Sequence, residues 1–499
     1  MMLTIHPSFE EFREKFAAGE PQIVYAKQIN DLETPVSAML KLPTGDGPRF
    51  LLESVEGGEA RGRYSIIGLA PDLVWRCVGN RPETSTTPPF ADDSFAPSWD
   101  ASMDSLRQLI RANRMDLPEG VPPMAAGLVG FMGYDMVKLM ERLPSTKTDP
   151  IRIPDACFMR PRAQLIFDSV DGVVYIIAPV WNTQGDAKKT YDEAVARITN
   201  LARTLQNPVD QRNYYKEVAP RDRNFTSNIT REQFGEMIDR AKEYIRAGDI
   251  FQVVLGQRFT CDFDLPPFAL YRSLRHTNPS PFLFYLDFGH YTLVGSSPEI
   301  LVRLRDDTVT IRPIAGTRPR GKTKAEDEAL AADLLADPKE LAEHLMLLDL
   351  GRNDVGRVAA SGDVRVTEKM IIEHYSHVMH IVSNVEGKID PKHDALDALC
   401  AGFPAGTVSG APKIRAMEII DELEPIARSY YGGCVGYFSA NGSMDTCITL
   451  RTGLIKDGKL HVQAGGGIVA DSKTDDEYAE STNKAKAIMR AAANAVKFA

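Results

Sequence analysis

Strand and helix patterns follow one another along this chain of 499 residues without a regular alternation. Apolar runs bounded by turn residues, such as residues 50–55 and 172–177, indicate strands in the first half. Further on, Thr230 and Gln233 make a capping-box pair before apolar residues at helical spacing, and Gly248 ends that run. A doubly wound sheet needs strands and helices in strict turn, so the sequence predicts an α+β fold instead.

Three other segments also have helical patterns, at residues 100–115, 338–351 and 475–497. The second of them begins with an Asp-Pro pair, in which Asp caps the helix and Pro takes its first position. Two polar segments rich in turn residues separate such elements. We expect residues 81–97 to form a solvated loop and residues 206–228 to link two units of the chain.

The charge of the chain excludes some classes of partner. Lys and Arg number 58 against 68 Asp and Glu, which gives a formal net charge of −10. An acidic chain has no general attraction for nucleic acid. No apolar run approaches the roughly 18 residues of a membrane span, and the first residues do not resemble a secretory signal. Six cysteines without a C-x-x-C pair indicate reduced thiols, so we expect a cytoplasmic protein that does not bind membranes.

Two pairs of glutamates stand out because each pair lies on one helix face. Glu340 and Glu343 are three residues apart in the helix expected at 338–351, and Glu477 and Glu480 are three apart in the last helix. Taken singly, such a pair is more often a solvated surface. If both faces point into one cavity, the gathered carboxylates need a cation, and hard oxygen ligands favour Mg²⁺.

Three other features suit a small anion next to such a metal. A glycine run at residues 464–468 ends an apolar strand and lets a ligand approach the backbone. Residues 403–413 are dense in turn formers and hydrogen-bond donors. Arg451 ends another strand, where its guanidinium could clamp a carboxylate. Together these features describe a site for a small anion with several carboxylates, bridged by Mg²⁺.

Residues 316–323 match the P-loop pattern, which is typical of nucleotide-binding proteins. However, Pro319 lacks the backbone N–H that such a loop directs at phosphate, and Arg318 and Arg320 are bulky where small residues normally lie. A P-loop NTPase therefore stays a minor alternative. A non-catalytic scaffold is another alternative, but it would not need convergent carboxylates.

Two further patterns have simple explanations. Cys434 lies in a G-x-C-x-G sequence like that of a glutaminase nucleophile, but no H-x-E follows it to supply the base. We expect a small buried cysteine in a glycine-rich strand. His374, His377 and His380 recur at every third residue, yet no carboxylate-histidine motif accompanies them, so we do not expect a zinc site.

Several long motifs resemble those of the chorismate-utilising enzymes: PIAGTRPRG, ELAEHLMLLDLGRND, FPAGTVSGAPK, YYGGCVGYFS, QAGGGIVADS and DDEYAESTNKA, with LLES, GRYSIIG and GFMGYD in the first half. The resemblance covers about residues 22–490 and is strongest to the anthranilate-forming branch. It implies two antiparallel sheets packed together with helices outside. It also implies an N-terminal region at residues 22–165, with part of a tryptophan pocket, and a chorismate-binding catalytic region at residues 225–490.

By that resemblance, the reaction converts chorismate and ammonia to anthranilate and pyruvate, the first step of tryptophan biosynthesis. Mg²⁺ would be held mainly by Glu343 and Glu480, with Glu340 and Glu477 close behind, and would grip the ring carboxylate. Glu299 resembles the family's general acid, which protonates the departing C4 hydroxyl, and His380 resembles the histidine linked to pyruvate elimination. The substrate would be held by Gly316, Thr317, Thr407, Tyr431, Arg451, Gly465, Gly466, Gly467 and Lys484.

Two positions distinguish the branches of the family. The water-using members resemble one another in a lysine at the position of Gln252, and an amide cannot serve as that base. The aminodeoxychorismate-forming branch has a lysine where this chain has Ala315, which offers no amine for a covalent intermediate. Both residues favour anthranilate, and the aminodeoxychorismate-forming branch remains the alternative.

The resemblance also implies a partner and a regulator. A separate glutaminase subunit would deliver ammonia, because the chain has no glutaminase segment of its own, so a hetero-oligomer is expected. Tryptophan would act as a feedback inhibitor in a pocket away from the catalytic site. That pocket would include Glu53, Ser54, Pro281, Phe282 and Leu283, and related enzymes often have Met in place of this Leu.

Overall fold

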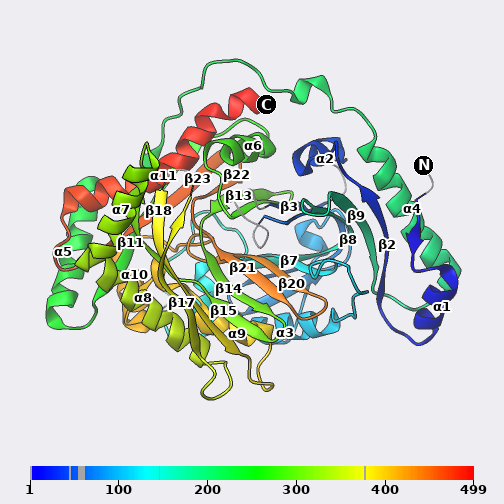
Figure 1. Cartoon of the computed structure of the whole chain (residues 1–499), viewed down its shortest axis with the longest axis horizontal. Coiled ribbons are helices and arrows are strands. Elements are labelled where there is room, and N and C mark those ends of the chain that lie inside the picture. The colour runs from blue at the N-terminus through cyan, green and yellow to red at the C-terminus, as the bar shows by residue number, and fades with distance from the viewer. Residues whose placement is uncertain (1–2, 44–46, 54–61, 145, 376–377) are drawn as a thin grey trace.

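Antiparallel strands form the framework of the computed structural model (Figure 1), which describes residues 3–43, 47–53, 62–144, 146–375 and 378–499. Within these ranges, the strands join into one hydrogen-bonded network, and all pairings between them are antiparallel.

The helices are α1 (Phe9–Ala17), α2 (Pro35–Lys41), α3 (Ser102–Ala112), α4 (Ala187–Leu205), α5 (Arg231–Ala247), α6 (Pro267–Thr277), α7 (Lys324–Ala336), α8 (Pro338–Gly356), α9 (Ala395–Gly402), α10 (Lys413–Leu423) and α11 (Thr474–Asn494). The strands are β1 (Ile5–His6), β2 (Gln22–Ile29), β3 (Arg49–Glu53), β4 (Tyr64–Val78), β5 (Arg81–Ser85), β6 (Ala96–Pro97), β7 (Gly127–Met132), β8 (Ala156–Asp168), β9 (Val173–Val180), β10 (Thr226–Ser227), β11 (Gln252–Asp262), β12 (Phe282–Asp287), β13 (Tyr291–Ser297), β14 (Ile300–Arg305), β15 (Thr308–Ile311), β16 (Ile314–Pro319), β17 (Arg365–His374), β18 (Val378–Lys388), β19 (Gly410–Ala411), β20 (Cys434–Ser439), β21 (Met444–Ile448), β22 (Thr452–Lys456) and β23 (Lys459–Ile468).

Three hydrophobic cores show how the layers are arranged. The inner core joins strand faces such as those of Phe131, Ile166 and Leu293, and no helix contributes to it within the described residues. Of the two outer cores, one packs α3, α5, α8, α9 and α10 against strands, and the other packs α1, α2, α4, α6 and α11. The expected α+β fold, with packed antiparallel sheets and helices outside, is confirmed.

Strands from the two halves of the chain pair directly with each other. β3 pairs with β12, and β7 pairs with β20 in a register that sets Gly130 opposite Gly436. The inner core therefore contains residues from both of the ranges 22–165 and 225–490. The division of the chain into these two regions stays a prediction.

Several local predictions are confirmed. In α5, the Thr230 N–H donates to Gln233 Oε1 at 2.8 Å and the Gln233 N–H donates to Thr230 Oγ1 at 3.2 Å. Gly248 then ends the helix with φ of 82°. The predicted linker, residues 206–228, crosses from α4 towards the C-terminal helix over the top of the molecule in Figure 1, with a 3₁₀ turn at Gln211–Asn213 and strand β10 near its end. Its role as a link between two units stays a prediction.

Two local predictions are wrong. Helix α8 does not stop at Gly351 but continues to Gly356. An added Cβ at Gly351 would lie 3.5 Å from Ile311, an ordinary contact distance, so this glycine neither ends the helix nor is needed for close packing. The expected loop at 81–97 contains β5, which pairs with β4, because Pro82 and Ser85 are buried there. Among the described residues, no helix combines the length and apolar character needed to cross a bilayer.

Candidate active site

A cavity of about 560 Å³ lies where α8 and α11 approach strands β11, β16 and β23. It gathers nearly all of the predicted catalytic, substrate-binding and metal-binding residues. Those that line it are Glu299, Gly316, Thr317, Glu340, Glu343, His380, Thr407, Tyr431, Arg451, Gly465, Gly467, Glu477, Glu480 and Lys484. Segments that are far apart in sequence thus form one site.

The four glutamates enter the cavity from two helices. Glu340 and Glu343 lie in the first turns of α8, and Glu477 and Glu480 lie in the first half of α11. Burial, followed by the charge of Glu343, raises the pKa of Glu340. Burial also raises the pKa of Glu477, and the charge of Glu480 adds to this effect. In each pair, the charge of the second glutamate thus disfavours ionisation of Glu340 or Glu477, and a bound cation would relieve this repulsion.

The donor set fits a hard cation. Glu477 Oε2 is buried and has no hydrogen-bond partner among the described residues, whereas Glu477 Oε1 accepts from the Ser472 hydroxyl at 2.7 Å. Glu480 is held by Lys484 at 2.8 Å, and Glu343 accepts from Gln252 at 3.4 Å. Within the described ranges, no three His, Cys, Asp or Glu side chains form a ready-made metal cage. This arrangement suits Mg²⁺, which keeps several waters and uses few carboxylates.

Glu299 has the properties of a general acid at neutral pH. It follows β13, is 5% exposed, and accepts a hydrogen bond from the Thr407 hydroxyl at 2.8 Å. Burial raises the pKa of Glu299 to about 8, although Thr407 and Arg451 act in the opposite direction. A carboxyl group that stays protonated at neutral pH can give a proton to a leaving hydroxyl.

His380 is positioned on β18 by the backbone of β16. Its Nδ1 lies 2.9 Å from the Gly316 carbonyl oxygen and 3.0 Å from Thr317 Oγ1. A carbonyl only accepts, so Nδ1 carries the proton and Nε2 keeps its lone pair. Burial lowers the pKa of His380, which favours the neutral ring. This histidine can therefore accept a proton inside the cavity.

The remaining predicted residues bring two cationic side chains and the glycine backbone of β23 to the cavity. Arg451 adopts φ of 46°, in the left-handed region, at the start of β22. Lys484 donates to the Gly465 carbonyl at 3.1 Å. An added Cβ at Gly467 would lie 2.1 Å from Gln252 Nε2, so a larger residue would displace the end of that side chain.

Gly466 is the exception among the predicted substrate-binding residues, since it is absent from the described lining of the cavity. An added Cβ there would lie 3.0 Å from Glu477 Oε2 and 3.5 Å from Glu480 Oε1, so Gly466 leaves space beside two of the predicted metal ligands. The residues that sequence reasoning missed are mainly apolar wall residues such as Ile314, Leu347 and Val462. Their side chains have no reactive group that could have revealed them.

The profile of a family described as chorismate binding enzyme matches residues 49–490. This chain belongs to that family. Anthranilate synthase component 1 of Cereibacter sphaeroides is 56% identical over 493 residues, covering 99% of this chain and 98% of the relative. The protein of the same name from Pseudomonas putida is 48% identical, covering 97% of this chain and 98% of the relative.

A solved structure agrees with this assignment. Anthranilate synthase component I from Streptococcus pneumoniae has a TM-score of 0.77 and 35% identity, covering 93% of this chain and 99% of that one. The menaquinone-specific isochorismate synthase of Escherichia coli has a TM-score of 0.68 at 18% identity, covering 97% of this chain and 98% of that one, which shows a shared fold. Within the chorismate-binding enzymes, this chain is thus similar to the anthranilate synthase component 1 proteins.

A second cavity, of about 510 Å³, contains most of the predicted inhibitor pocket. Glu53, Pro281, Phe282 and Leu283 line it, and Ser54 lies outside the described residues. Glu53 is buried and accepts from the Tyr271 hydroxyl and from Arg275 Nε, each at 2.8 Å.

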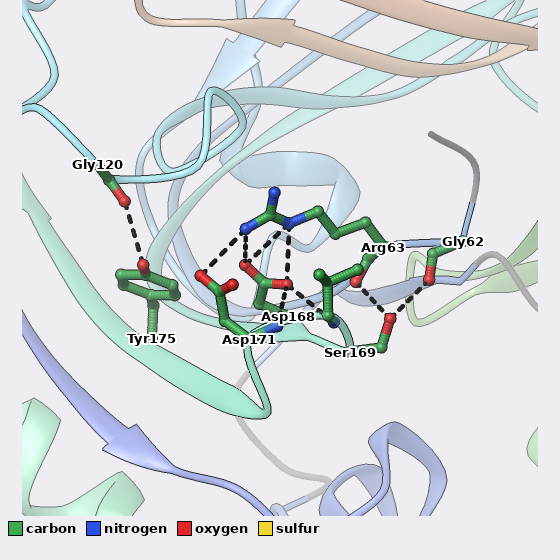
Figure 2. A network of polar contacts seen from close by, with 8 residues as sticks. Gly62, Arg63, Gly120, Asp168, Ser169, Asp171 and Tyr175 are labelled. Atoms are coloured by element: carbon green, nitrogen blue, oxygen red, sulfur yellow. Dashed lines mark hydrogen bonds and ion pairs between the residues drawn. The ribbon is translucent and has the colours of Figure 1, made fainter. Parts of the chain in front are cut away.

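Arg63 lies at the rim of this second cavity in a polar network (Figure 2). Its Nη2 is 2.7 Å from Asp168 Oδ2 and 3.1 Å from Asp171 Oδ2, and its Nε is 2.9 Å from Asp168 Oδ1. The guanidinium is therefore fixed by one carboxylate at the end of β8 and one in the turn after it, and this anchors the start of strand β4, which follows Arg63.

The competing motifs have structural roles. In the P-loop-like segment, the Gly321 N–H donates to Asp327 and the Lys322 N–H donates to Glu326, each at 2.8 Å. Carboxylates of α7 already take the amides that a phosphate would need, which contradicts the nucleotide-binding alternative. Cys434 is buried in β20, and burial raises its pKa to about 12, so it is no nucleophile. His377 lies outside the described residues.

Proposed function

We propose that this chain converts chorismate and ammonia to anthranilate and pyruvate. The main support is Glu299, a buried carboxyl that is protonated at neutral pH in the same cavity as four convergent glutamates and Arg451. A weakly acidic group can protonate a substrate hydroxyl that leaves as water. Arg451 and a bound cation suit the carboxylates of the same substrate.

The residues divide the reaction between them. Glu299 gives its proton to the C4 hydroxyl, the C4–O bond breaks, and water leaves while ammonia forms a bond to C2. The new C2 ammonium group returns a proton to Glu299. The neutral His380 then takes the C2 proton, the C3–O bond breaks and the ring becomes aromatic, and the departing enolate takes that proton from His380 to become pyruvate. Arg451 and Lys484 orient the carboxylates of the substrate. When Mg²⁺ is bound by Glu343 and Glu480, with Glu340 and Glu477 nearby, it supplies charge stabilisation to the ring carboxylate.

The nucleophile is ammonia because of two neutral residues in the cavity wall. Gln252 and Ala315 both line the cavity, and neither can activate water or form a covalent intermediate with the ring. The relatives named component 1 support a second component, and we propose a glutaminase that supplies the ammonia.

We infer that tryptophan binds in the second cavity and inhibits the enzyme. Phe282 and Leu283 offer apolar surface to an indole, and arginines and Glu53 offer charges for the two ends of an amino acid. Tryptophan should inhibit the wild-type chain, and Phe282→Ala should need about tenfold more tryptophan. Equal inhibition of both proteins would contradict this binding site.

The reaction is tested with purified chain, chorismate, Mg²⁺ and an ammonium salt at about pH 8, where part of Glu299 keeps its proton and some free ammonia is present, by fluorescence and mass spectrometry. Anthranilate and pyruvate should form, and EDTA should stop their formation. Aminodeoxychorismate or salicylate would keep the site but contradict the roles given to Ala315 and Gln252. Glu299→Gln is the matched control, since it keeps the shape of the carboxyl and removes its proton.

A further inference from the structure

A fully buried ion pair lies behind the wall of the active-site cavity. Arg428 Nε donates to Glu424 Oε2 at 2.9 Å, and Arg428 Nη2 donates to Glu424 Oε1 at 2.6 Å. Their side chains are 1% and 3% exposed. Removing two charges from water is costly, and apolar residues of similar volume often serve stability equally well. Stability alone therefore does not explain why two charged residues are buried here.

The same two side chains hold backbone groups from two walls of the cavity. Arg428 Nη1 donates to the Val408 carbonyl at 2.5 Å, and Nη2 donates to the Val254 carbonyl at 2.7 Å. The Gly256 N–H donates to Glu424 Oε1 at 2.8 Å. The planar guanidinium of Arg428 donates in several fixed directions at once. A lysine ammonium group in its place could not make the same set of contacts.

The held backbone groups are next to the reacting side chains. Val408 follows Thr407, whose hydroxyl donates to Glu299. Val254 lines the cavity on β11, the strand that also carries Gln252, which donates to Glu343. The guanidinium carbon also lies 5.6 Å from the ring centre of Tyr431, another residue of the cavity wall. Arg428 does not appear among the described lining residues, so it acts on the site through others.

We propose that the Arg428–Glu424 pair is a positioning unit that holds Thr407 against Glu299 and aligns the β11 wall for the reaction. This inference rests on the proposed conversion of chorismate. It assigns the pair to alignment of the reacting groups more than to substrate binding, because Arg428 contacts the backbone of Val408 and Val254 and does not line the cavity.

The test separates stability from positioning. Arg428→Met combined with Glu424→Gln removes both charges and keeps an acceptor for the Gly256 N–H. The double variant should stay folded with a moderately lower denaturation midpoint, because replacing the charges as a unit costs little while the Val408 and Val254 carbonyls lose a donor. Its kcat should fall about 100-fold, while the chorismate KM changes less than about threefold.

The pH profile gives a second readout, which a purely structural pair would not move. The Thr407 hydrogen bond lowers the pKa of Glu299, so a loosened Thr407 should move the basic limb of kcat to higher pH. Arg428→Lys keeps the charge without the fork, and its kcat should fall about tenfold with the same direction of shift. If the double variant fails to fold, Arg428→Lys decides the question.

A matched control removes an arginine elsewhere. Arg160 donates two hydrogen bonds to the Asp72 carboxylate, at 2.7 and 3.1 Å, and neither residue is among the described lining of the two cavities. The kcat of Arg160→Met should therefore equal that of the wild type. A wild-type kcat and pH profile in a folded Arg428 variant would overturn the inference. Absence of anthranilate from the wild-type reaction would instead overturn the proposed function.

Discussion

Replacing Glu299 with Gln should change how the stability of the protein depends on pH. Burial raises the pKa of Glu299 to about 8 from its ordinary value of 4.5, so the folded state holds this proton more tightly than the unfolded state. The stability from this group is complete below pH 4.5 and is lost as the pH rises towards about 8. The loss amounts to about 1.4 kcal/mol per pH unit and to about 5 kcal/mol in total.

Glu299→Gln has no proton to lose and should not show this decline. The free energy of unfolding of both proteins is measured with urea at about pH 5.5 and about pH 7.5. Between these two pH values, the wild type should lose about 3 kcal/mol of stability relative to the variant. Thr407→Val is the companion variant. Because the Thr407 hydrogen bond lowers the pKa of Glu299, its removal should extend the decline to higher pH. Parallel pH curves for wild type and Glu299→Gln would refute the reasoning.

The same group should control turnover. With free ammonia held constant, kcat should fall above about pH 8, where Glu299 loses its proton. Glu299→Gln should still bind chorismate but turn it over at least about 100-fold more slowly. A variant with an unchanged basic limb would show that another group supplies the proton.

Three further predictions concern the metal, the glycine wall and a buried thiol. Glu343→Gln should weaken Mg²⁺ binding at least about tenfold by calorimetry, and unchanged binding would remove this residue from the proposed ligands. Gly467→Ala should raise the chorismate KM about tenfold, because the new Cβ displaces the Gln252 side chain, whose amide is 2.1 Å away. A wild-type KM would show that Gln252 moves without consequence. Cys434→Ala should keep kcat within about twofold and native protein should resist iodoacetamide, whereas inactivation by the reagent would point to a reactive thiol.

Local sequence signals succeeded where the cause is itself local. The capping box of Thr230 and Gln233 and the left-handed Gly248 set the ends of α5 through contacts within a few residues. The glycine signal failed at Gly351, because helix α8 continues past it to Gly356. Gly466, in contrast, leaves space beside the Glu477 and Glu480 carboxylates of α11. A glycine has several uses, and distant neighbours select among them.

The residue types of the site could be read from the chain, because carboxylates at helical spacing and long family motifs are properties of order along the backbone. Their convergence could not, since α8 packs on β16 and β18 while α11 packs on β23, and only the tertiary structure brings these strands to one cavity. The proton on Glu299 depends on burial and on a hydroxyl from a distant turn. The Arg428–Glu424 pair carries no motif at all, and its meaning comes from the carbonyls that surround it. The sequence determines which chemical groups are present. Their burial, their charge balance and their alignment in the site depend on contacts between distant residues, which only folding creates.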